Sequence, residues 1–177
     1  SDIVVPDVDA IVRPAEGAKP DTIRDLAYGL VRVLDSDGRA GGSWNPGLST
    51  DRKLAMLRTM MLVRAFDDRM FRAQRQGKTS FYMKSTGEEA TSVATAMALD
   101  RGDMCFPSYR QQGILIARDY PLVRMMNQIY SNRGDHLMGR QLPIMYSAPD
   151  HGFFSVSGNL ATQYPQAVGW AMASAAK

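Results

Sequence analysis

The chain has 177 residues, a length that fits one domain, and 45% of them are apolar while 22% are charged. This balance supplies enough apolar surface for a core and excludes a disordered chain. The net charge is only +3, from 21 basic and 18 acidic residues, and no basic run or nucleic-acid-reading motif indicates a nucleic-acid partner. No apolar run reaches the roughly 20 residues of a membrane-spanning helix. The single cysteine, Cys105, excludes an intramolecular disulfide and fits a reducing, intracellular compartment.

Residues 1–50 are predicted to form an extended N-terminal arm with a short helix and a short strand. Residues 1–20 contain three prolines and few large apolar side chains, which is typical of an extended segment. Asp21 is a candidate cap for a helix over residues 22–29. The loose alternation of residues 31–34, followed by a turn signal, predicts the strand.

The second part, residues 51–177, opens with the longest predicted helix, over residues 51–76. Apolar side chains fall on two of its faces, which is typical of a helix buried between layers or between subunits. One stripe consists of Leu54, Leu57, Met61 and Ala65, and the other of Met56, Met60, Val63 and Met70. Four charged residues of the helix are candidates for ion pairs across an interface, or they form a solvated face. They are Arg64, Asp67, Asp68 and Arg69.

Further helices alternate with short apolar segments in the rest of the chain. The helices are predicted over residues 87–99, 108–118 and 121–130 and from Pro165 onward. Thr86 with Glu89, and Ser108 with Gln111, have the form of capping boxes. The apolar segments 104–106 and 153–156 each come before a helix. This alternation predicts an α/β fold in which helices dominate.

The first junction between an apolar segment and a helix is a candidate anion site. Tyr109 and Arg110 are expected in the first turn of the helix that begins at Ser108. The guanidinium group of Arg110 suits bidentate contact with a phosphate, and the free N–H groups of the first helical turn would face the same anion. The alternative is a plain capping box in which Arg110 is a surface charge.

The second junction combines a glycine with four polar side chains. Gly158 allows a ligand to approach the backbone closely. The polar residues are Ser157, Asn159, Thr162 and Gln163. Their oxygens are suited to ligate a hard monovalent cation, or they cap the following helix. If the two junctions lie side by side, they form a polar cleft at the edge of a sheet.

Other residues with reactive or ligating side chains indicate no site. Cys105 lies in an apolar run and is expected to be a buried thiol, because no histidine lies near it in the sequence. His136 and His151 lack the spacing of metal ligands and are expected in loops. Glycine-rich nucleotide motifs and the nucleophile elbow of hydrolases are absent from the sequence.

Four segments together carry a resemblance that none of them carries alone. They are FYMKSTGEEA, DMCFPSYRQQGILIARD, GRQLPIMYS and FFSVSGNLATQYPQAVGWAMA. In this order and at this spacing they resemble the alpha subunits of branched-chain 2-oxo acid dehydrogenases, the decarboxylating components that depend on thiamine diphosphate. The resemblance runs from Asp21 to Lys177. It implies a thiamine-diphosphate-binding fold with a parallel sheet, of which residues 51–177 are the first part.

The resemblance implies roles for residues at both junctions. Tyr109 and Arg110 match the pair that holds the diphosphate of the cofactor. Gly158 and Leu160 match the segment that touches the aminopyrimidine ring. The family's potassium site, which orders this loop, corresponds to Ser157, Asn159, Thr162 and Gln163.

Three departures from the family pattern bear on the site and on activity. Some relatives carry serine at the position of Gly158 and proline at that of Asn159, so the family's side-chain contacts do not carry over there, while backbone contacts can. Some relatives carry a histidine where this chain has Gly152, and His151 does not align with it, so no catalytic residue is assigned. The family's magnesium motif, a GDG sequence followed by an asparagine, would begin after Lys177. We therefore expect this chain alone to bind thiamine diphosphate weakly and to show no turnover.

The implied reaction is the oxidative decarboxylation of branched-chain 2-oxo acids, such as 3-methyl-2-oxobutanoate, with acyl transfer to lipoyl groups. The implied partners are a beta subunit, in an α2β2 heterotetramer, and the lipoyl-bearing acyltransferase core. The long helix and the helix over residues 87–99 would then be subunit contacts. The implied location is the bacterial cytoplasm, or the mitochondrial matrix in a eukaryote. The alternatives are a pyruvate or acetoin dehydrogenase alpha subunit, and a non-catalytic assembly module for a beta subunit.

Overall fold

The structure is a computed structural model and describes residues 5–176. The chain divides into two compact units between Ser49 and Thr50, where helix α1 begins. Among residues 5–176, every helix is too short or too polar to cross a bilayer.

The N-terminal unit contains short turns instead of the predicted helix and strand. Two 3-10 turns, η1 (Pro20–Thr22) and η2 (Arg24–Ala27), occupy the place of the helix predicted over residues 22–29. The predicted strand is reduced to an isolated antiparallel bridge between Leu34 and Ala40. No residue between 5 and 49 is buried. These predictions are wrong because a segment without a buried apolar face gains too little from packing to extend a helix or a strand.

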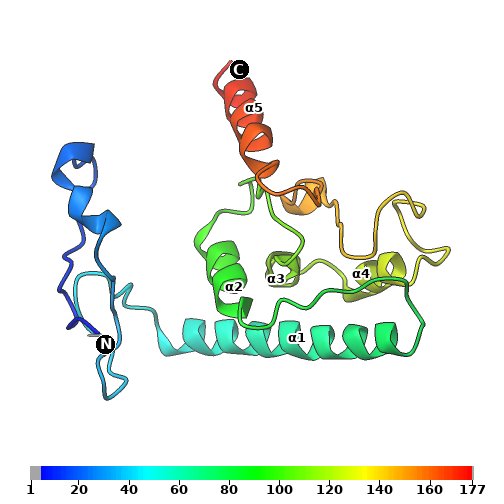
Figure 1. Cartoon of the computed structure of the whole chain (residues 1–177), viewed down its shortest axis with the longest axis horizontal. Coiled ribbons are helices and arrows are strands. Elements are labelled where there is room, and N and C mark those ends of the chain that lie inside the picture. The colour runs from blue at the N-terminus through cyan, green and yellow to red at the C-terminus, as the bar shows by residue number, and fades with distance from the viewer. Residues whose placement is uncertain (1–4, 177) are drawn as a thin grey trace. The chain divides into compact units, whose positions relative to one another are not determined.

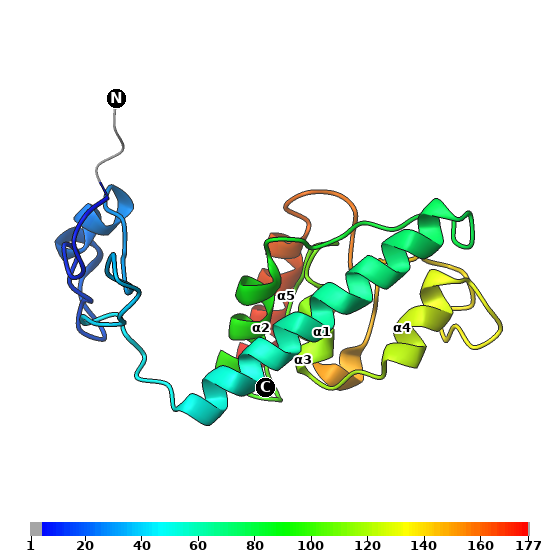
Figure 2. The same cartoon turned by 90° about the horizontal axis from the view of Figure 1, so that it is seen from below.

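Within residues 50–176, the second unit is an assembly of five α-helices. They are α1 (Thr50–Arg75), α2 (Glu89–Ala98), α3 (Gln112–Ala117), α4 (Leu122–Ile129) and α5 (Gln163–Ala175), with a 3-10 turn η3 (Pro149–His151) before α5. Helix α1 runs the length of the unit and packs against α2 and α3, which also pack against each other (Figures 1 and 2). The prediction of this long helix is confirmed to within one residue at each end.

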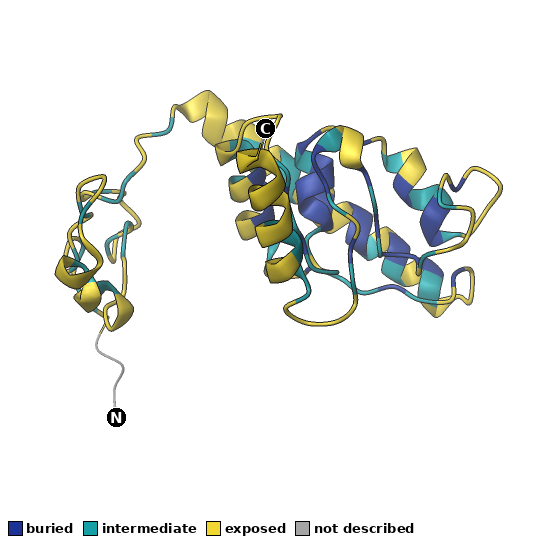
Figure 3. Ribbon diagram, turned by 90° about the horizontal axis from the view of Figure 1, so that it is seen from above, coloured by how far each residue is buried: buried dark blue, intermediate teal, exposed yellow. Residues whose placement is uncertain are grey.

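The core lies where α1 meets the helices and loops that pack against it, and the buried residues are dark blue in Figure 3. Its most buried side chains include Val63, Met70, Val93, Leu115, Met125, Ile129 and Phe153. In α4 the predicted core stripe is confirmed, because Met125 and Ile129 are buried and Leu122 and Met126 pack beside them. By contrast, α5 contains no buried residue, so its apolar positions at Val168 and Met172 do not face this core.

Both predicted capping boxes form incompletely. At α2 the cap is Glu88, without a side-chain hydrogen bond, and Glu89 accepts from the N–H of Gly87 instead. At the first junction the N–H of Ser108 donates to Gln111 Oε1 at 2.8 Å, but α3 begins only at Gln112. A side-chain bond closes a turn here, while the helix begins where its apolar residues are buried.

No strand forms among the residues that the structure describes. The apolar segments that were predicted beside a sheet instead meet as isolated bridges, one parallel between Cys105 and Phe153 and one antiparallel between Ala148 and Phe153. The fold class is therefore seen as a helix-rich domain with one parallel bridge.

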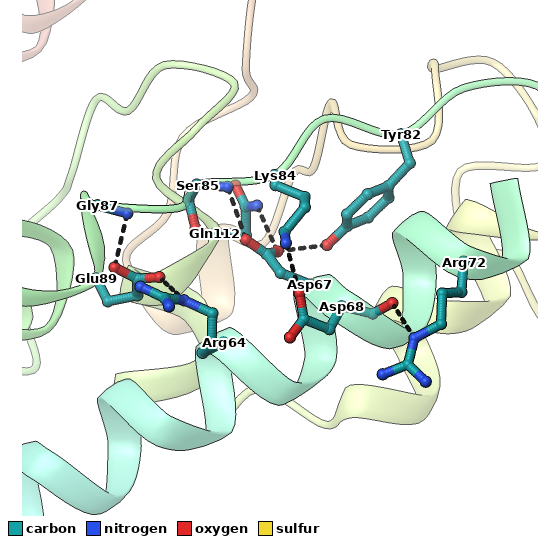
Figure 4. Close-up of polar contacts among 10 residues, drawn as sticks. All are labelled: Arg64, Asp67, Asp68, Arg72, Tyr82, Lys84, Ser85, Gly87, Glu89 and Gln112. Atoms are coloured by element: carbon teal, nitrogen blue, oxygen red, sulfur yellow. Dashed lines mark hydrogen bonds and ion pairs between the residues drawn. The ribbon is translucent and has the colours of Figure 1, made fainter. Parts of the chain in front are cut away.

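Three of the four candidate charged residues of α1 find their partners within the chain. Asp67 is buried and accepts hydrogen bonds from neighbouring segments. Arg64 pairs with Glu89 of α2, and Asp68 pairs with Lys84 (Figure 4). Arg69, the fourth of these residues, is exposed and makes no ion pair within residues 5–176. Asp67 therefore belongs neither to a solvated face nor to an ion pair across an interface, and both predictions are wrong for this residue.

Candidate functional site

The two predicted junctions are neighbours in space. The N–H of Cys105 donates to the carbonyl of Gly152 at 2.7 Å, and the N–H of Phe154 donates to the carbonyl of Cys105 at 2.9 Å. This pattern is that of two parallel segments. Because the segments run in the same direction, the residues that follow them leave at the same end.

Aromatic contacts extend this pairing to α5. The ring centroids of Phe106 and Phe154 lie 5.0 Å apart. The indole of Trp170 meets these two rings edge-on at 6.2 and 6.4 Å. In addition, the side-chain amide of Gln163 donates to the carbonyl of Pro107 at 3.3 Å. Helix α5 is thus anchored to both segments beside the first junction.

At the first junction, Arg110 has only weak partners. Its Nη1 lies 3.8 Å from Glu88 Oε1, and its Nε donates to the sulfur of Met83 at 3.2 Å. Its guanidinium carbon lies 5.8 Å from the ring centre of Tyr109, whose hydroxyl makes no hydrogen bond within residues 5–176. Both residues lie in the turn before α3, not in its first turn as predicted. A half-exposed guanidinium with a thioether and a distant carboxylate as partners is available to bind an anion.

At the second junction, three oxygens lie close together. Ser157 Oγ accepts from the N–H of Asn159 at 3.3 Å and lies 3.4 Å from Thr162 Oγ1, which donates to the carbonyl of Asn159 at 3.0 Å. The N-cap of α5, Thr162, makes no side-chain capping bond. The helix-capping alternative is therefore wrong here. The loop also stores strain, because Ala161 has φ 66.

A groove of 480 Å³ opens beside the second junction. Its lining residues are Gln141, Leu142, Met145, Ser155, Val156, Ser157, Gly158, Asn159 and Gln166. A Cβ atom at Gly158 would lie 3.5 Å from the Met145 methyl, an ordinary contact, so this position has room for a Cβ atom. Leu160 is 79% exposed. The segment around Leu142 and Met145 thus lies against the loop that carries Gly158, a juxtaposition the sequence alone did not predict.

Arg118 is a supporting residue that sequence analysis missed. This buried guanidinium donates from Nη1 to the carbonyls of Asp103, His151 and Gly152, and from Nη2 to the carbonyl of Asp100. It therefore ties the loop before the first segment to the loop before the second. The available signal was an arginine that directly follows the apolar run Gly113–Ala117.

Asp67 is the second supporting residue, and the sequence indicated it only as a candidate for an ion pair or a solvated face. Its carboxylate accepts from the hydroxyl of Tyr82 at 2.6 Å, from the N–H and hydroxyl of Ser85, and from the side-chain amide of Gln112 (Figure 4). Burial, together with the neighbouring carboxylate, raises the pKa of Tyr82, so its hydroxyl stays a donor. The network fixes residues 82–85 on α1 and α3, and this segment includes Met83, the neighbour of Arg110.

Cys105 and the two histidines take no part in a reactive cluster. The predicted burial of Cys105 is confirmed, and this burial raises the pKa of the thiol and disfavours the nucleophilic thiolate. His136 Nε2 lies 3.1 Å from the carbonyl of Ser147, and His151 Nδ1 lies 3.3 Å from Asp150. Within residues 5–176, no three His, Cys, Asp or Glu side chains are arranged to hold a metal ion.

Comparison with known proteins identifies the family. The sequence profile described as "Dehydrogenase E1 component" matches residues 57–177, more than half of the chain. The chain belongs to the dehydrogenase E1 component family. The matched range of this E1 chain includes both junctions.

Among the curated proteins to which this E1 chain is similar are 2-oxoisovalerate dehydrogenase alpha subunits. It is 61% identical over 165 residues to the one from Pseudomonas aeruginosa, covering 93% of this chain and 40% of that protein. It is 42% identical to the mitochondrial subunit of Mus musculus, covering 82% of this chain and 33% of the relative. It is 41% identical to the mitochondrial alpha subunit 1 of Arabidopsis thaliana, covering 78% of this chain and 29% of that relative. The chain therefore spans two fifths or less of the length of these relatives.

Proposed function

We propose that this chain is the diphosphate-anchoring part of a 2-oxoisovalerate dehydrogenase alpha subunit. The observation that carries the proposal is the parallel bridge between Cys105 and Phe153, since both junctions then follow their segments at the same end. The 61% identity to the Pseudomonas aeruginosa subunit favours this enzyme over a pyruvate or acetoin dehydrogenase.

The reaction of the whole enzyme would be an oxidative decarboxylation. A branched 2-oxo acid, such as 3-methyl-2-oxobutanoate, loses its carboxylate as carbon dioxide. The remaining acyl carbon loses two electrons, and these electrons reduce the disulfide of a lipoyl group. One sulfur ends as a thioester with the acyl group, and the other takes up a proton as a thiol. Bound thiamine diphosphate supplies the electron-accepting thiazolium ring for this chemistry.

The residues of this chain would hold and orient the cofactor. Arg110 and the hydroxyl of Tyr109 bind the diphosphate, because both side chains lack strong partners among the described residues. Gly158 and Leu160 contact the aminopyrimidine ring through the loop at the second junction. The groove beside Gly158 and the exposure of Leu160 support this assignment.

Two cations would complete the site. A diphosphate carries more negative charge than Arg110 balances, so we assign a magnesium ion whose ligands lie outside residues 1–177. The potassium site comprises Ser157, Asn159, Thr162 and Gln163. Neutral oxygens suit such a cation, and the mutual contacts of Ser157, Asn159 and Thr162 support this assignment.

A parallel sheet would extend from the Cys105 segment. Cys105 directs both of its backbone groups toward residues 152 and 154. In an extended segment, the groups of Met104 and Phe106 then point to the opposite side, and they make no backbone hydrogen bond with residues 5–176. The contact of Trp170 with both Phe106 and Phe154 indicates that α5 crosses over both segments. A further parallel strand of the proposed sheet would pair at this open edge.

The assembly we propose contains a beta subunit, in an α2β2 heterotetramer, and the lipoyl-bearing acyltransferase core. The names of the relatives, which are alpha subunits, support the beta subunit. With a bacterial and several mitochondrial relatives, the location would be the bacterial cytoplasm, or the mitochondrial matrix in a eukaryote.

The test uses the full reading frame that encodes this chain, co-expressed with a beta subunit. We expect thiamine- and magnesium-dependent decarboxylation with preference for 3-methyl-2-oxobutanoate. Preference for pyruvate would contradict the substrate assignment, and a stable pair without decarboxylation would identify an assembly module. The 177-residue chain by itself is expected to bind the cofactor weakly in isothermal titration with magnesium, and submicromolar binding would overturn that expectation.

A matched pair of variants tests the diphosphate anchor. Arg110→Ala should raise the Kd for thiamine diphosphate roughly 30-fold, because it removes charge-assisted hydrogen bonds worth about 2 kcal/mol. Arg133→Ala is the control, since Arg133 is also exposed and lies away from both junctions in the sequence. Equal effects of the two substitutions would exclude the anchor.

A further inference from the structure

The sulfur of Met83 is the hydrogen-bond acceptor for the guanidinium group of Arg110. The Nε–H of Arg110 donates to this sulfur at 3.2 Å, across 27 positions of the chain. Within residues 5–176, the single ion pair of Arg110 is a long one, from Nη1 to Glu88 Oε1 at 3.8 Å. The orientation of the guanidinium group is therefore set mainly by a thioether, and not by a carboxylate.

This contact decides which edge of the Arg110 guanidinium is free. A guanidinium group has one N–H on Nε and two on each Nη atom, and it binds a phosphate with two parallel N–H bonds from one edge. The edge that contains Nε faces Met83. The edge formed by Nη1 and Nη2 remains, and Glu88 lies beside it. The chain thus already places one negative group near this free edge.

Met83 occupies a well-fixed position. Its carbonyl accepts from the side-chain amide of Gln112 at 3.4 Å. Tyr82 before it and Ser85 after it both donate to the buried carboxylate of Asp67 (Figure 4). The side chain of Met83 also packs against the core. The sulfur is therefore a fixed point to which an exposed side chain can be attached.

A thioether suits this task because it is a neutral and weak acceptor. It orients the Arg110 guanidinium without cancelling the positive charge. A carboxylate in the place of the sulfur would orient the group but would also compete with a negatively charged ligand for it. Glu88 does so only weakly, since its side chain and that of Arg110 are 44% and 47% exposed and solvent screens the pair.

We propose that Met83 is a positioning residue for Arg110: it holds Nε so that both Nη atoms face the diphosphate of the cofactor. The proposal rests on the proposed function, in which Arg110 binds this diphosphate. An arginine that is ordered before the cofactor arrives loses less conformational entropy on binding. The diphosphate then takes the place of Glu88 beside Nη1.

The alternative is that Met83 only fills space beside the core, which is the usual role of a methionine. Met83→Leu separates the two roles, because leucine keeps the apolar volume and removes the acceptor. Met126→Leu is the matched control. Met126 on α4 is also partly buried against the core, and its sulfur accepts no hydrogen bond from residues 5–176.

The first measurement is nuclear magnetic resonance of the Nε–H group of Arg110 in the 177-residue chain without cofactor. The order parameter of this group should exceed that of Arg133, which is exposed and makes no hydrogen bond within residues 5–176. Met83→Leu should lower it to the Arg133 value, and Met126→Leu should leave it unchanged. An Arg110 group in the unmodified chain that is as mobile as that of Arg133 would overturn the proposal.

The second measurement is the Kd for thiamine diphosphate, by titration calorimetry with magnesium, of the full reading frame co-expressed with a beta subunit. Met83→Leu should raise the Kd roughly fivefold, because the arginine must then be ordered on binding. Met83→Gln should restore the Kd to within about twofold, since its amide oxygen accepts from Nε. Equal increases in both variants, or an increase in Met126→Leu, would overturn the proposal.

A double-mutant cycle shows whether Met83 acts through Arg110. In an Arg110→Ala background, Met83→Leu should not change the Kd further, because the sulfur then has no guanidinium to hold. The same increase in both backgrounds would show that Met83 supports the site by packing or touches the cofactor itself. That result would overturn the proposal.

Glu88→Gln tests which edge of the guanidinium group faces the anion. The Glu88 side chain makes no capping bond to α2, so the helix should be retained. Removing its charge should lower the Kd about twofold, because a half-exposed carboxylate no longer competes for Nη1. A raised Kd would show that Glu88 holds Arg110 in place, which would overturn the assignment of the free edge.

Failure of this inference and failure of the proposed function give different results. If the proposed function fails, Arg110→Ala leaves the Kd for thiamine diphosphate unchanged. If only this inference fails, Arg110→Ala still raises the Kd, whereas Met83→Leu does not.

Discussion

The side-chain amide of Gln163 donates a hydrogen bond to the carbonyl of Pro107, a residue 56 positions earlier in the chain. Gln163 begins α5, and Pro107 lies two residues before Tyr109. Because α5 buries none of its residues, this bond and the contacts of Trp170 are its main attachments. The position of α5 beside the first junction therefore depends on a few contacts.

Replacing Gln163 should loosen α5. Gln163→Leu removes the donor and keeps the size of the side chain, at a cost of about 1 kcal/mol. We expect the amide groups of α5 to exchange about fivefold faster in hydrogen-exchange measurements. The control is Gln166→Leu on the same helix, because no hydrogen bond of the Gln166 side chain holds the two junctions together. Equal acceleration in both variants would contradict this role of Gln163.

Asp67 should be the most sensitive charged residue of α1. Asp67→Asn keeps one acceptor oxygen but turns an amide group toward the donors from Tyr82, Ser85 and Gln112. A buried network left partly unsatisfied in this way loses about 3 kcal/mol of the free energy of unfolding. Urea denaturation gives the value. Asp51→Asn, at the exposed start of the same helix, should cost less than about 1 kcal/mol.

Gly152 should tolerate no side chain. It has φ +62, and a Cβ atom would lie 2.1 Å from Arg118 Nη1 and 2.5 Å from the carbonyl oxygen of Asp103. Gly152→Ala thus combines backbone strain with displacement of the buried guanidinium, and we expect a loss of about 3 kcal/mol or more.

The matched control for this prediction is Gly139→Ala. Gly139 has φ +71, but a Cβ atom there would meet nothing within 4 Å. It should cost only the backbone strain of about 1 kcal/mol. Similar melting temperatures for the two variants would show that Arg118 moves aside easily.

The ion pair between Arg64 and Glu89 should make stability depend on pH in mild acid. The hydrogen bond from Arg64 holds the pKa of Glu89 below its ordinary value, although burial opposes this shift. A lowered pKa in the folded state means that the unfolded state binds the proton more readily. The stabilisation is therefore complete above the ordinary value near 4.5 and is lost as the pH falls through the lower folded value.

The Glu89→Gln variant isolates this contribution. At neutral pH it should be less stable than the unmodified chain by about 1 kcal/mol, since Arg64 is half exposed and solvent screens the pair. The difference should shrink as the pH falls below 4.5. A difference that stays constant down to pH 2 would show that the carboxylate charge is not its source.

The sequence predicted most of the helices because their signals are local. The apolar periodicity of α1 and of α4 survives in the structure, and α1 was placed to within one residue at each end. The junction residues were likewise recognisable from the sequence, since Tyr109–Arg110 and Ser157–Gln163 are contiguous motifs. Their proximity follows from the bridge between Cys105 and Phe153, which joins residues 48 positions apart by number and has no local signal.

What the sequence alone determined about this protein is its family, its helices and the residue types of two junctions. Only the tertiary structure decided that Asp67 and Arg118 are buried supports and that Ser157 and Thr162 do not cap α5. It also decided that, within residues 5–176, only one of the two apolar stripes of α1 is buried. A pattern of apolar residues reports that a face will be buried, but not what buries it. The partner of a buried face, like the partner of a buried charge, is set by packing between segments distant in the chain.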